Sequence, residues 1–249
     1  MPKSKLFRFF PWYVGSKASW VNFLEPMFKG SPFVELFAGS GALTANLGQK
    51  NSILIDLDPH ICWILSHYDQ LIVPETFTKE DYLEKRKSPD WQRYILVLSR
   101  LAFSGVFRYS KNGWNVPYRE SKKPINLEEI KKEYQRNLQR WRELEPIVIN
   151  SDYRSAAVDF EKKVVVADPP YAGSQVAYLS KKFDFDAYWK LIKEELPKKA
   201  EGIILFDTYQ NLSQQGIPIL GTRTMCVNGA KERGKEALAI FKNGEWLKC

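Results

Sequence analysis

The sequence has few residues of the kinds that build disulfide frameworks or histidine-rich metal sites. It holds three cysteines, none in a Cys-x-x-Cys spacing, and two histidines in 249 residues. An odd number of unpatterned cysteines is typical of a reducing compartment. No segment approaches the roughly 20 apolar residues of a membrane span, and the N-terminus lacks the apolar core and cleavage site of a signal peptide. We therefore expect a soluble intracellular protein without a metal site or a membrane partner.

Acidic residues are outnumbered, because 37 lysines and arginines stand against 29 aspartates and glutamates and give a net charge of +8. A moderately basic chain is compatible with a polyanionic partner such as nucleic acid, but the charge alone does not require one. Hydrophobic residues make up 44% of the chain, enough for a proper core. The length allows one large domain, or one domain with a sizeable insertion.

Apolar segments typical of buried strands alternate with helical patterns at both ends of the chain. Phe33 to Phe37 and Ile53 to Ile55 are such segments, each followed by a loop and a helix start. The pattern resumes with "PIVIN", "KVVVADPPY" and "GIILFDTY", and the C-terminal end predicts two strands in a hairpin at the sheet edge. This alternation predicts an α/β fold with a parallel sheet.

The middle of the chain, residues 69 to 145, is highly charged and has poor strand signals. We expect helices over "DWQRYILVLSRLAFSGVF" and over "NLEEIKKEYQRNLQRWREL", the second capped by Asn126. The stretch "RYSKNGWNVPYRESKKP" is predicted to be a basic loop with interleaved aromatic residues. We interpret residues 69–145 as a mainly helical insertion into an α/β domain formed by residues 1–68 and 146–249.

The loop after the first strand contains two glycines, Gly39 and Gly41, in "ELFAGSGA". Ligands of open α/β sheets bind beyond the carboxyl ends of the strands, and glycine permits close approach to the backbone. Asp56 ends the next strand, where a carboxylate can accept hydrogen bonds from both hydroxyls of a ribose. Thr44 stands where a dinucleotide fingerprint has its third glycine, so S-adenosylmethionine fits better than NAD. A tight turn without a ligand is the alternative for this loop.

The segment "VVVADPPYAG" ends a buried strand with a carboxylate, two prolines and an aromatic residue. Asp168 and the carbonyl of Pro169 can each accept one N–H of an exocyclic amine and direct its lone pair toward a methyl sulfonium. Pro169 and Pro170 fix the backbone that places these acceptors. Tyr171 offers a face on which a flipped-out base can stack. This arrangement suffices for an in-line methyl transfer and requires no metal.

These motifs resemble those of the Dam-type (class alpha) DNA adenine-N6 methyltransferases. The tetrapeptide Asp168 to Tyr171 is similar to the family's catalytic motif, and "FVELFAGSGA" to its cofactor loop. "YVGSK" (Tyr13 to Lys17) resembles the family's aromatic-x-Gly-Gly-Lys, with Ser16 in place of the second glycine. The segments "LIDLD", "SDY" and "KEALAIFKN" resemble further family segments, so the resemblance covers nearly the whole chain in the right order.

The resemblance implies a Rossmann-like S-adenosylmethionine-dependent methyltransferase sheet with an inserted DNA target-recognition domain. Tyr13 and Lys17 are implied to contact the cofactor, Asp152 and Tyr153 to hold its adenine, and Asp56 its ribose. Glu35 either holds the cofactor's amino group or orders the loop. The cofactor-binding residues expected from the loop and the resemblance together are Tyr13, Lys17, Glu35, Phe37, Gly39, Gly41, Asp56, Asp152 and Tyr153.

"FSGVFRYSKNGWNVPY" (Phe103 to Tyr118) resembles the family's target-recognition stretch, with Ser104 replacing an asparagine and Trp114 a phenylalanine. Arg108 is expected to read a base, since arginine bonds guanine bidentately in the major groove; a phosphate contact is the alternative. The expected DNA-binding residues are Ser104, Arg108, Asn115, Pro117 and Arg119.

The implied activity is methyl transfer to N6 of a flipped adenine in double-stranded DNA, with a GATC-like site as the family's default. The alternatives are a DNA-binding protein with an inactive methyltransferase fold, a methyltransferase acting on cytosine N4, RNA or a protein amide, and a nicotinamide enzyme. The expected setting is the cytoplasm of a bacterium, or of a bacterial host of a virus, in association with the nucleoid. The expected state is a monomer or weak dimer, with a cognate restriction endonuclease as a candidate partner.

Overall fold

The computed structural model describes residues 6–10, 13, 15–103, 107–120, 125–171, 183–227 and 232–248. Ser104, one of the expected DNA-binding residues, lies outside them. No helix in these ranges is both long enough and apolar enough to cross a bilayer.

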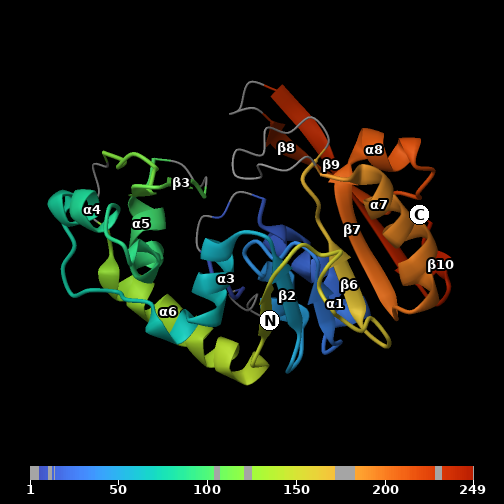
Figure 1. Cartoon of the computed structure of the whole chain (residues 1–249), viewed down its shortest axis with the longest axis horizontal. Helices are drawn as coiled ribbons and strands as arrows, with labels where there is room; N and C mark the ends of the chain where they lie inside the picture. The colour runs from blue at the N-terminus through green and yellow to red at the C-terminus, as the bar shows by residue number, and fades with distance from the viewer. Residues whose placement is uncertain are drawn as a thin grey trace.

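A mostly parallel sheet forms the centre of the molecule (Figure 1). Its strands follow the order β10-β9-β7-β6-β1-β2-β5, and β8 pairs with the outer side of β9. Strands β5, β2, β1, β6 and β7 run parallel, whereas β9 is antiparallel to β7, β8 and β10. The strands are β1 (Phe33–Glu35), β2 (Ile53–Asp56), β5 (Ile147–Asn150), β6 (Val164–Ala167), β7 (Gly202–Thr208), β8 (Gly221–Val227), β9 (Glu232–Lys242) and β10 (Glu245–Trp246).

The strand order reverses between β1 and β6. From β1 the chain adds β2 and then β5 on one side, and from β6 it adds β7 and then β9 on the other. In open α/β sheets the ligand crevice lies at the carboxyl ends of the strands at such a reversal. The loops that follow β1 and β6 are therefore placed together by topology.

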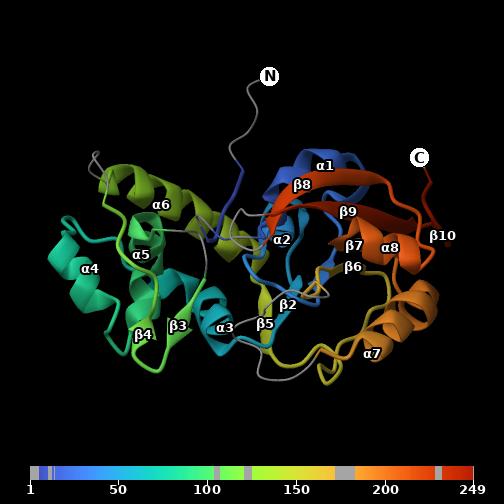
Figure 2. The same ribbon diagram turned by 90° about the horizontal axis from the view of Figure 1, so that it is seen from above.

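Helices cover both faces of the sheet, as the alternation within β6 requires. Val164 and Val166 pack with helices α1 and α2, whereas Val165 and Ala167 pack with α7 and α8 on the opposite face. Figure 2 shows α1 on one side of the strands and α7 on the other. These elements are the 3-10 helix η1 (Lys17–Trp20), α1 (Val21–Phe28), α2 (Ala42–Leu47), α3 (Pro59–Ser66), α7 (Phe185–Lys190) and α8 (Tyr209–Gln214).

Helices dominate the described part of the middle of the chain. They are the 3-10 helices η2 (Tyr68–Gln70) and η3 (Trp91–Tyr94), and the helices α4 (Lys79–Lys85), α5 (Ile95–Leu101) and α6 (Leu127–Leu144). Asn126 caps α6 as predicted, because its side chain accepts the amide of Glu129 at 3.0 Å. A capping box between Thr78 and Asp81 opens α4.

A short antiparallel hairpin, β3 (Tyr109–Ser110) with β4 (Gly113–Trp114), occupies part of the predicted basic loop. The sequence pattern did not predict it, because two-residue strands are too short to show a period. The hairpin is fixed by what lies beneath it: the Trp114 amide donates to the Arg86 carbonyl at 2.8 Å, and the Trp114 indole donates to the Tyr82 hydroxyl at 3.2 Å.

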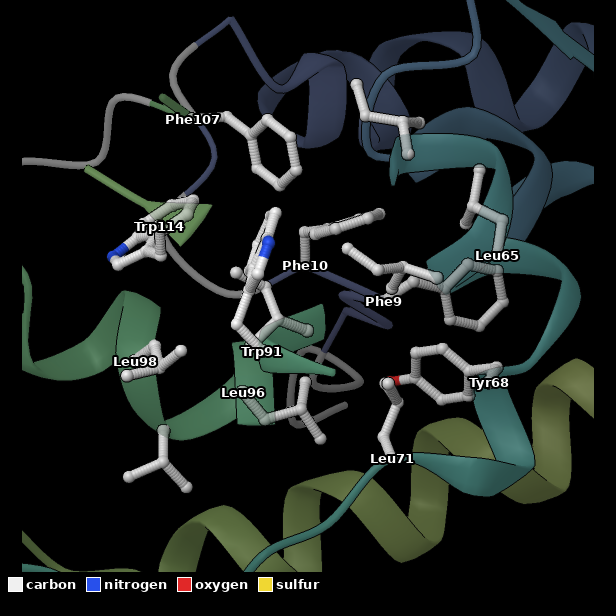
Figure 3. Packing of buried hydrophobic residues seen from close by; sticks show 14 of the residues in the cluster. Phe9, Phe10, Leu65, Tyr68, Leu71, Trp91, Leu96, Leu98, Phe107 and Trp114 are labelled. Carbon is white, nitrogen blue, oxygen red and sulfur yellow. The ribbon is translucent and has the colours of Figure 1, made fainter. Parts of the chain in front are cut away.

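One continuous hydrophobic core joins this middle segment to α3 and to the N-terminal segment (Figure 3). Leu65 of α3, Phe10 of the N-terminal segment, Trp91 of η3 and Phe107 before β3 are all buried in it. The Phe107 ring lies 6.0 Å from both Phe10 and Trp91, centroid to centroid. Large aromatic side chains contribute the most buried area per residue, so this contact fixes the middle segment against the N-terminal segment.

The N-terminal segment also connects the two parts. The Phe7 amide and carbonyl bond to the Asn46 side chain of α2, while Asn137 of α6 accepts from and donates to the backbone of Arg8. Arg140 of α6 donates to the Ala45 and Gly48 carbonyls, at the C-terminal end of α2. Residues 6–8 therefore form a strap between α2 and α6.

The predicted parallel α/β sheet is confirmed, with its strand positions. The predicted C-terminal pair of strands is also present as β8 and β9, but β9 is an inner strand, because it pairs with β7 on one side and with β8 and β10 on the other. The proposed boundaries 1–68, 69–145 and 146–249 stay a prediction.

Candidate active site

Acidic residues gather at the carboxyl edge of the sheet around the reversal of strand order. Glu35 ends β1, Asp56 ends β2, and Asp168 directly follows β6. Glu236 belongs to β9, which pairs antiparallel with β7, and lies opposite Thr208 at the end of that strand. Glu35 and Glu236 are almost fully buried, at 4% and 2% exposure.

Backbone amides hold Glu35 and Asp56. Glu35 Oε1 accepts the Thr44 amide in the first turn of α2 at 2.8 Å. Asp56 Oδ2 accepts the Gly39 amide and Oδ1 accepts the Asp58 amide, both at 2.9 Å. Burial raises the pKa of Glu35 to about 7 and that of Asp56 to about 6, although these hydrogen bonds act in the opposite direction. Both carboxylates thus shape the loop between β1 and α2.

Gly39 lies against the ring of Tyr13. It has a φ of +47°, and a Cβ on it would lie 3.2 Å from Tyr13 Cε1 and 3.3 Å from the Tyr13 hydroxyl oxygen. A side chain here would be strained in conformation and would press on the ring. Gly41 forms the N-cap of α2. The backbone of the loop therefore packs directly against the Tyr13 ring.

The replacement of a family glycine by Ser16 is explained by the backbone. Ser16 has a φ of −55°, which any residue adopts, whereas the retained Gly15 has a φ of +89°. Ser16 faces the glycine loop, with its Oγ 3.4 Å from Ser40 Oγ. Only the glycine in the left-handed region is required here, so the segment still delivers Lys17 to the site.

Aromatic rings line the side of the site beyond β1. Phe37 lies 5.2 Å from Tyr153, 5.8 Å from Phe183 and 6.1 Å from Tyr188, measured between ring centroids. Within the described ranges, the buried hydroxyls of Tyr153 and Tyr188 have no hydrogen-bond partner. Burial raises the pKa of Tyr153 to about 12, so both of these neutral phenols retain a proton to donate.

Asp152, beside this aromatic group, forms a bidentate pair with Arg154. Its oxygens lie 2.9 Å from Arg154 Nε and 2.8 Å from Nη2. Arg154 also pairs with Asp184 at 3.1 Å, which connects this loop to the start of α7. The Asp152 carboxylate is thereby fixed in orientation next to Tyr153.

Within the described residues, side chains hold Asp168 and Glu236. Lys17 Nζ lies 2.6 Å from Asp168 Oδ2 and 3.1 Å from Glu236 Oε1, and donates to the Gly15 carbonyl at 2.8 Å. The Tyr171 hydroxyl lies 2.7 Å from Glu236 Oε1 and 3.2 Å from Asp168 Oδ1. The tetrapeptide that begins with Asp168 is therefore joined to the N-terminal motif through one ammonium group.

These two carboxylates respond differently to the same cation. Burial raises the pKa of Asp168, and the Lys17 charge limits the increase. Burial acts on Glu236 in the same direction, but Lys17 and the hydrogen bonds from Trp20 and Tyr171 outweigh it, so that the pKa of Glu236 is lowered. Glu236 thus remains ionised at a pH where Asp168 begins to take up a proton.

The described residues expected to contact DNA lie on the hairpin and the segment after it. Arg108, Asn115, Pro117 and Arg119 are exposed, whereas the neighbouring Trp114 is buried in the core. The Arg108 guanidinium donates to the Asn115 carbonyl through Nε at 3.0 Å and Nη2 at 2.8 Å. Tyr13 lies 6.0 Å from Phe107, centroid to centroid, which places this surface next to the glycine loop.

Sequence reasoning brought together the correct strand ends but missed Glu236 and Arg223. Glu236 also accepts from the Trp20 indole at 2.9 Å and forms an ion pair with Arg223 Nε. A signal existed: "KEALAIF" places a glutamate at the start of a wholly apolar run, and glutamate is seldom buried without a partner. Pro169 is buried beside Asp168, in the expected position.

A family model for the D12 class N6 adenine-specific DNA methyltransferases matches residues 13–193. The chain belongs to this family. The match begins at Tyr13 and includes the glycine loop, the Arg108 hairpin and the tetrapeptide from Asp168 to Tyr171. The resemblance inferred from the motifs is thereby confirmed, and membership of this family agrees with S-adenosylmethionine as the cofactor.

Solved structures that resemble this chain were also found, all at low identity. A conserved hypothetical protein from Streptococcus pyogenes is 12% identical, with 92% of this chain and 98% of that chain covered and a TM-score of 0.42. A proposed methylase from Haemophilus influenzae is 14% identical, with 89% and 93% covered and a TM-score of 0.39. A proposed RNA methyltransferase from Pyrococcus horikoshii is 14% identical, with 91% and 81% covered and a TM-score of 0.40. A search of the curated proteins gave no match.

Proposed function

We propose that this D12-class methyltransferase transfers a methyl group from S-adenosylmethionine to N6 of an adenine flipped out of double-stranded DNA. The observation that best supports the proposal is the position of Asp168. It directly follows a core strand at the reversal of strand order, next to the glycine loop, and Lys17 and Tyr171 orient its carboxylate.

The cofactor fits the loop between β1 and α2 and the aromatic group beside it. Gly39 brings the loop backbone against the Tyr13 ring at a positive φ, and the buried Tyr153 and Tyr188 hydroxyls can donate to a ligand atom. We assign Gly39, Gly41 and Asp56 to the ribose side, and Phe37, Asp152 and Tyr153 to the adenine side. Glu35 orders the loop through Thr44. Tyr13 and Lys17 approach from the N-terminal motif. When bound, the cofactor supplies an electrophilic methyl on its sulfonium.

Asp168 and the Pro169 carbonyl accept the two N–H groups of the target amine. This interaction localises the nitrogen lone pair, which is otherwise delocalised into the purine ring, and fixes its direction of attack. Tyr171 packs against the flipped base, and Pro170 restricts the backbone between them. The acceptor must be ionised, so transfer is expected to fall at low pH as Asp168 is protonated, and its raised pKa moves this fall above the ordinary range of an aspartate.

Arg108, Asn115, Pro117, Arg119 and Ser104 are assigned to the DNA surface, with Arg108 as the base-reading residue and a GATC-like sequence as the target. The proposal includes a monomer or weak dimer that acts on the DNA of a bacterial cell, with a cognate endonuclease as a candidate partner. Action on cytosine N4 or RNA is the second candidate, because the same two acceptors can hold any exocyclic amine.

The direct test is incubation with radiolabelled S-adenosylmethionine and duplex DNA, followed by digestion to nucleosides. Label in N6-methyldeoxyadenosine is the expected result. Label in N4-methyldeoxycytidine, or in RNA alone, would replace the proposed substrate. No label in any nucleic acid, with cofactor bound, would indicate a DNA-binding protein without activity.

Replacement of Arg108 by alanine tests the assignment of the base-reading residue. We expect discrimination against a changed base pair to fall by about 1–3 kcal/mol at one position, with a smaller loss of non-specific affinity. Competition between duplexes that differ at single positions measures this effect. Lys111, also on the hairpin turn, is the matched control, because loss of a phosphate contact weakens binding to all sequences alike. A uniform loss in Arg108→Ala would assign Arg108 to phosphate instead.

A further inference from the structure

Glu236 has more polar contacts at the site than its place in an apolar strand predicts. Its Oε1 lies near Lys17 Nζ and the Tyr171 hydroxyl, and its Oε2 near the Trp20 indole and Arg223 Nε. It comes from a strand that no catalytic motif includes, 216 residues after Trp20. A carboxylate that is 2% exposed and held from four sides is fixed in place.

Lys17 is shared between this carboxylate and Asp168. An ammonium group has three N–H donors, and three acceptors surround Nζ: Asp168 Oδ2 at 2.6 Å, Gly15 O at 2.8 Å and Glu236 Oε1 at 3.1 Å. The shortest of these contacts occupies Oδ2 of Asp168. Oδ1 already accepts from the Tyr171 hydroxyl at 3.2 Å, so a target amine that bonds this carboxylate at Oδ2 competes there with Lys17.

We infer that Glu236 is a positioning residue that draws Lys17 away from Asp168 and so frees Asp168 to accept the target amine. The inference rests on the proposed function of Asp168. As the amine arrives, one of its N–H groups replaces the Lys17 hydrogen bond at Oδ2. Lys17 keeps a carboxylate partner, because Glu236 Oε1 is within 3.1 Å. No covalent bond changes in this step, and the cation is never left buried without a counterion, which would be costly.

Arg223 acts in the opposite direction. Its guanidinium pairs with Glu236 Oε2 and neutralises part of the charge that attracts Lys17. Removal of Glu236 should therefore leave Lys17 on Asp168, and removal of Arg223 should favour Lys17 on Glu236. The two substitutions are expected to affect Asp168 in opposite directions, a result that a merely structural role of this cluster does not predict.

The experiment measures the titration of Asp168 in the ligand-free protein by carbon-13 NMR of its carboxyl carbon, assigned with Asp168→Asn. The groups that face this carboxylate are Lys17 from η1, Tyr171 from its own loop, Glu236 from β9, Glu35 from β1, Asp207 from β7 and Tyr188 from α7. In Glu236→Gln the midpoint should fall by about one pH unit, since a repelling charge is lost and Lys17 stays close. In Arg223→Gln it should rise.

Steady-state kinetics of the same variants supply the second readout. In Glu236→Gln we expect kcat to fall roughly tenfold at pH 8, equivalent to about one pKa unit of competition at Asp168, with the KM for S-adenosylmethionine unchanged. The low-pH limb of the plot of kcat against pH should move to lower pH in Glu236→Gln and to higher pH in Arg223→Gln.

An unmoved Asp168 midpoint in both variants, or a shift in the same direction in both, would overturn the inference. If Glu236→Gln fails to fold, Arg223→Gln is the deciding variant, because the Arg223 side chain is partly exposed. A lower Asp168 midpoint in this variant would then contradict the inference. A wild-type protein that labels no nucleic acid would refute the proposed function instead, while the opposed NMR shifts would still show that Glu236 and Arg223 act on Asp168 in opposite directions.

Discussion

Two pairs of carboxylates at the sheet edge are held in two different ways. On the side of β1 and β2, Glu35 and Asp56 accept hydrogen bonds from the backbone amides of Thr44, Gly39 and Asp58. On the side of β6 and β9, Asp168 and Glu236 are held by Lys17, Tyr171 and Arg223. Backbone amides cannot leave without unfolding the loop, whereas long side chains can exchange partners. The first pair thus builds a fixed pocket, and the second can change its contacts during turnover.

The strongest test of this difference is Asp168→Asn. The amide keeps the shape but loses the charge and one acceptor, so we expect kcat to fall by at least about 10³-fold. Cofactor and DNA affinity should change little, which calorimetry and filter binding can measure. Asn211→Ala on α8, which pairs with the buried Asp207, controls for general disturbance of this edge. Appreciable turnover in Asp168→Asn would show that the carboxylate is not the essential acceptor.

The second test uses pH. Glu35 is protonated in the folded protein up to about pH 7, against 4.5 for its ordinary value. The folded state therefore binds more protons in this interval, and stability is greatest below it and falls as pH rises through it. Glu35→Gln should abolish about 1 kcal/mol of decline between pH 6 and 7.

The pKa values of Asp56 and Asp207 are raised to about 6, so these two residues change the stability mainly below the interval from pH 6 to pH 7. Urea unfolding at several pH values measures the slopes of wild type and variant. If the free energy of unfolding changed with pH equally in wild type and Glu35→Gln above pH 6, ionisation of Glu35 would have no effect on stability.

Asp56→Ala tests the fixed pocket directly. The Gly39 and Asp58 amides lose their acceptor, so the glycine loop should loosen and bind the demethylated cofactor about 10- to 100-fold more weakly, or about 1.4–2.7 kcal/mol. Isothermal titration measures the affinity. At saturating cofactor, kcat should remain close to that of wild type, in contrast to Asp168→Asn. A large fall in kcat with unchanged affinity would reverse the roles of the two pairs.

The smallest expected effects concern the turn that delivers Lys17. Gly15→Ala places a side chain at a φ of +89° and should destabilise the protein by about 1–2 kcal/mol. Ser16→Gly, at a φ of −55°, should cost less than about 1 kcal/mol, mainly through added freedom in the unfolded chain. Urea unfolding at pH 7 compares the two. Similar losses would show that the Ser16 hydroxyl, and not the backbone, stabilises this turn.

The sequence was sufficient where local pattern and strand topology decide the outcome. Hydrophobic periodicity and the positions of Gly and Pro are local signals. They were enough to predict the apolar strands, the cap at Asn126, and the positions of Asp56 and Asp168 at strand ends. It was insufficient where distant segments meet. The partner of Lys17 is 151 residues away at Asp168, and no spacing rule connects Lys17 with Glu236. The β3–β4 hairpin depends on Tyr82 and Arg86 beneath it, and so was equally hidden.

The core shared by α3, the N-terminal strap and the middle segment has a consequence for the exchange of segments between relatives. A chimera that exchanged only residues 69–145 with a relative would cut through the packing of Phe10, Leu65 and Phe107 and leave mismatched aromatic surfaces. Viable exchange would have to carry α3 and residues 6–10 along. Point changes on the exposed hairpin around Arg108 would disturb this core less than exchange of whole segments, because the Asn115 and Arg119 side chains are exposed.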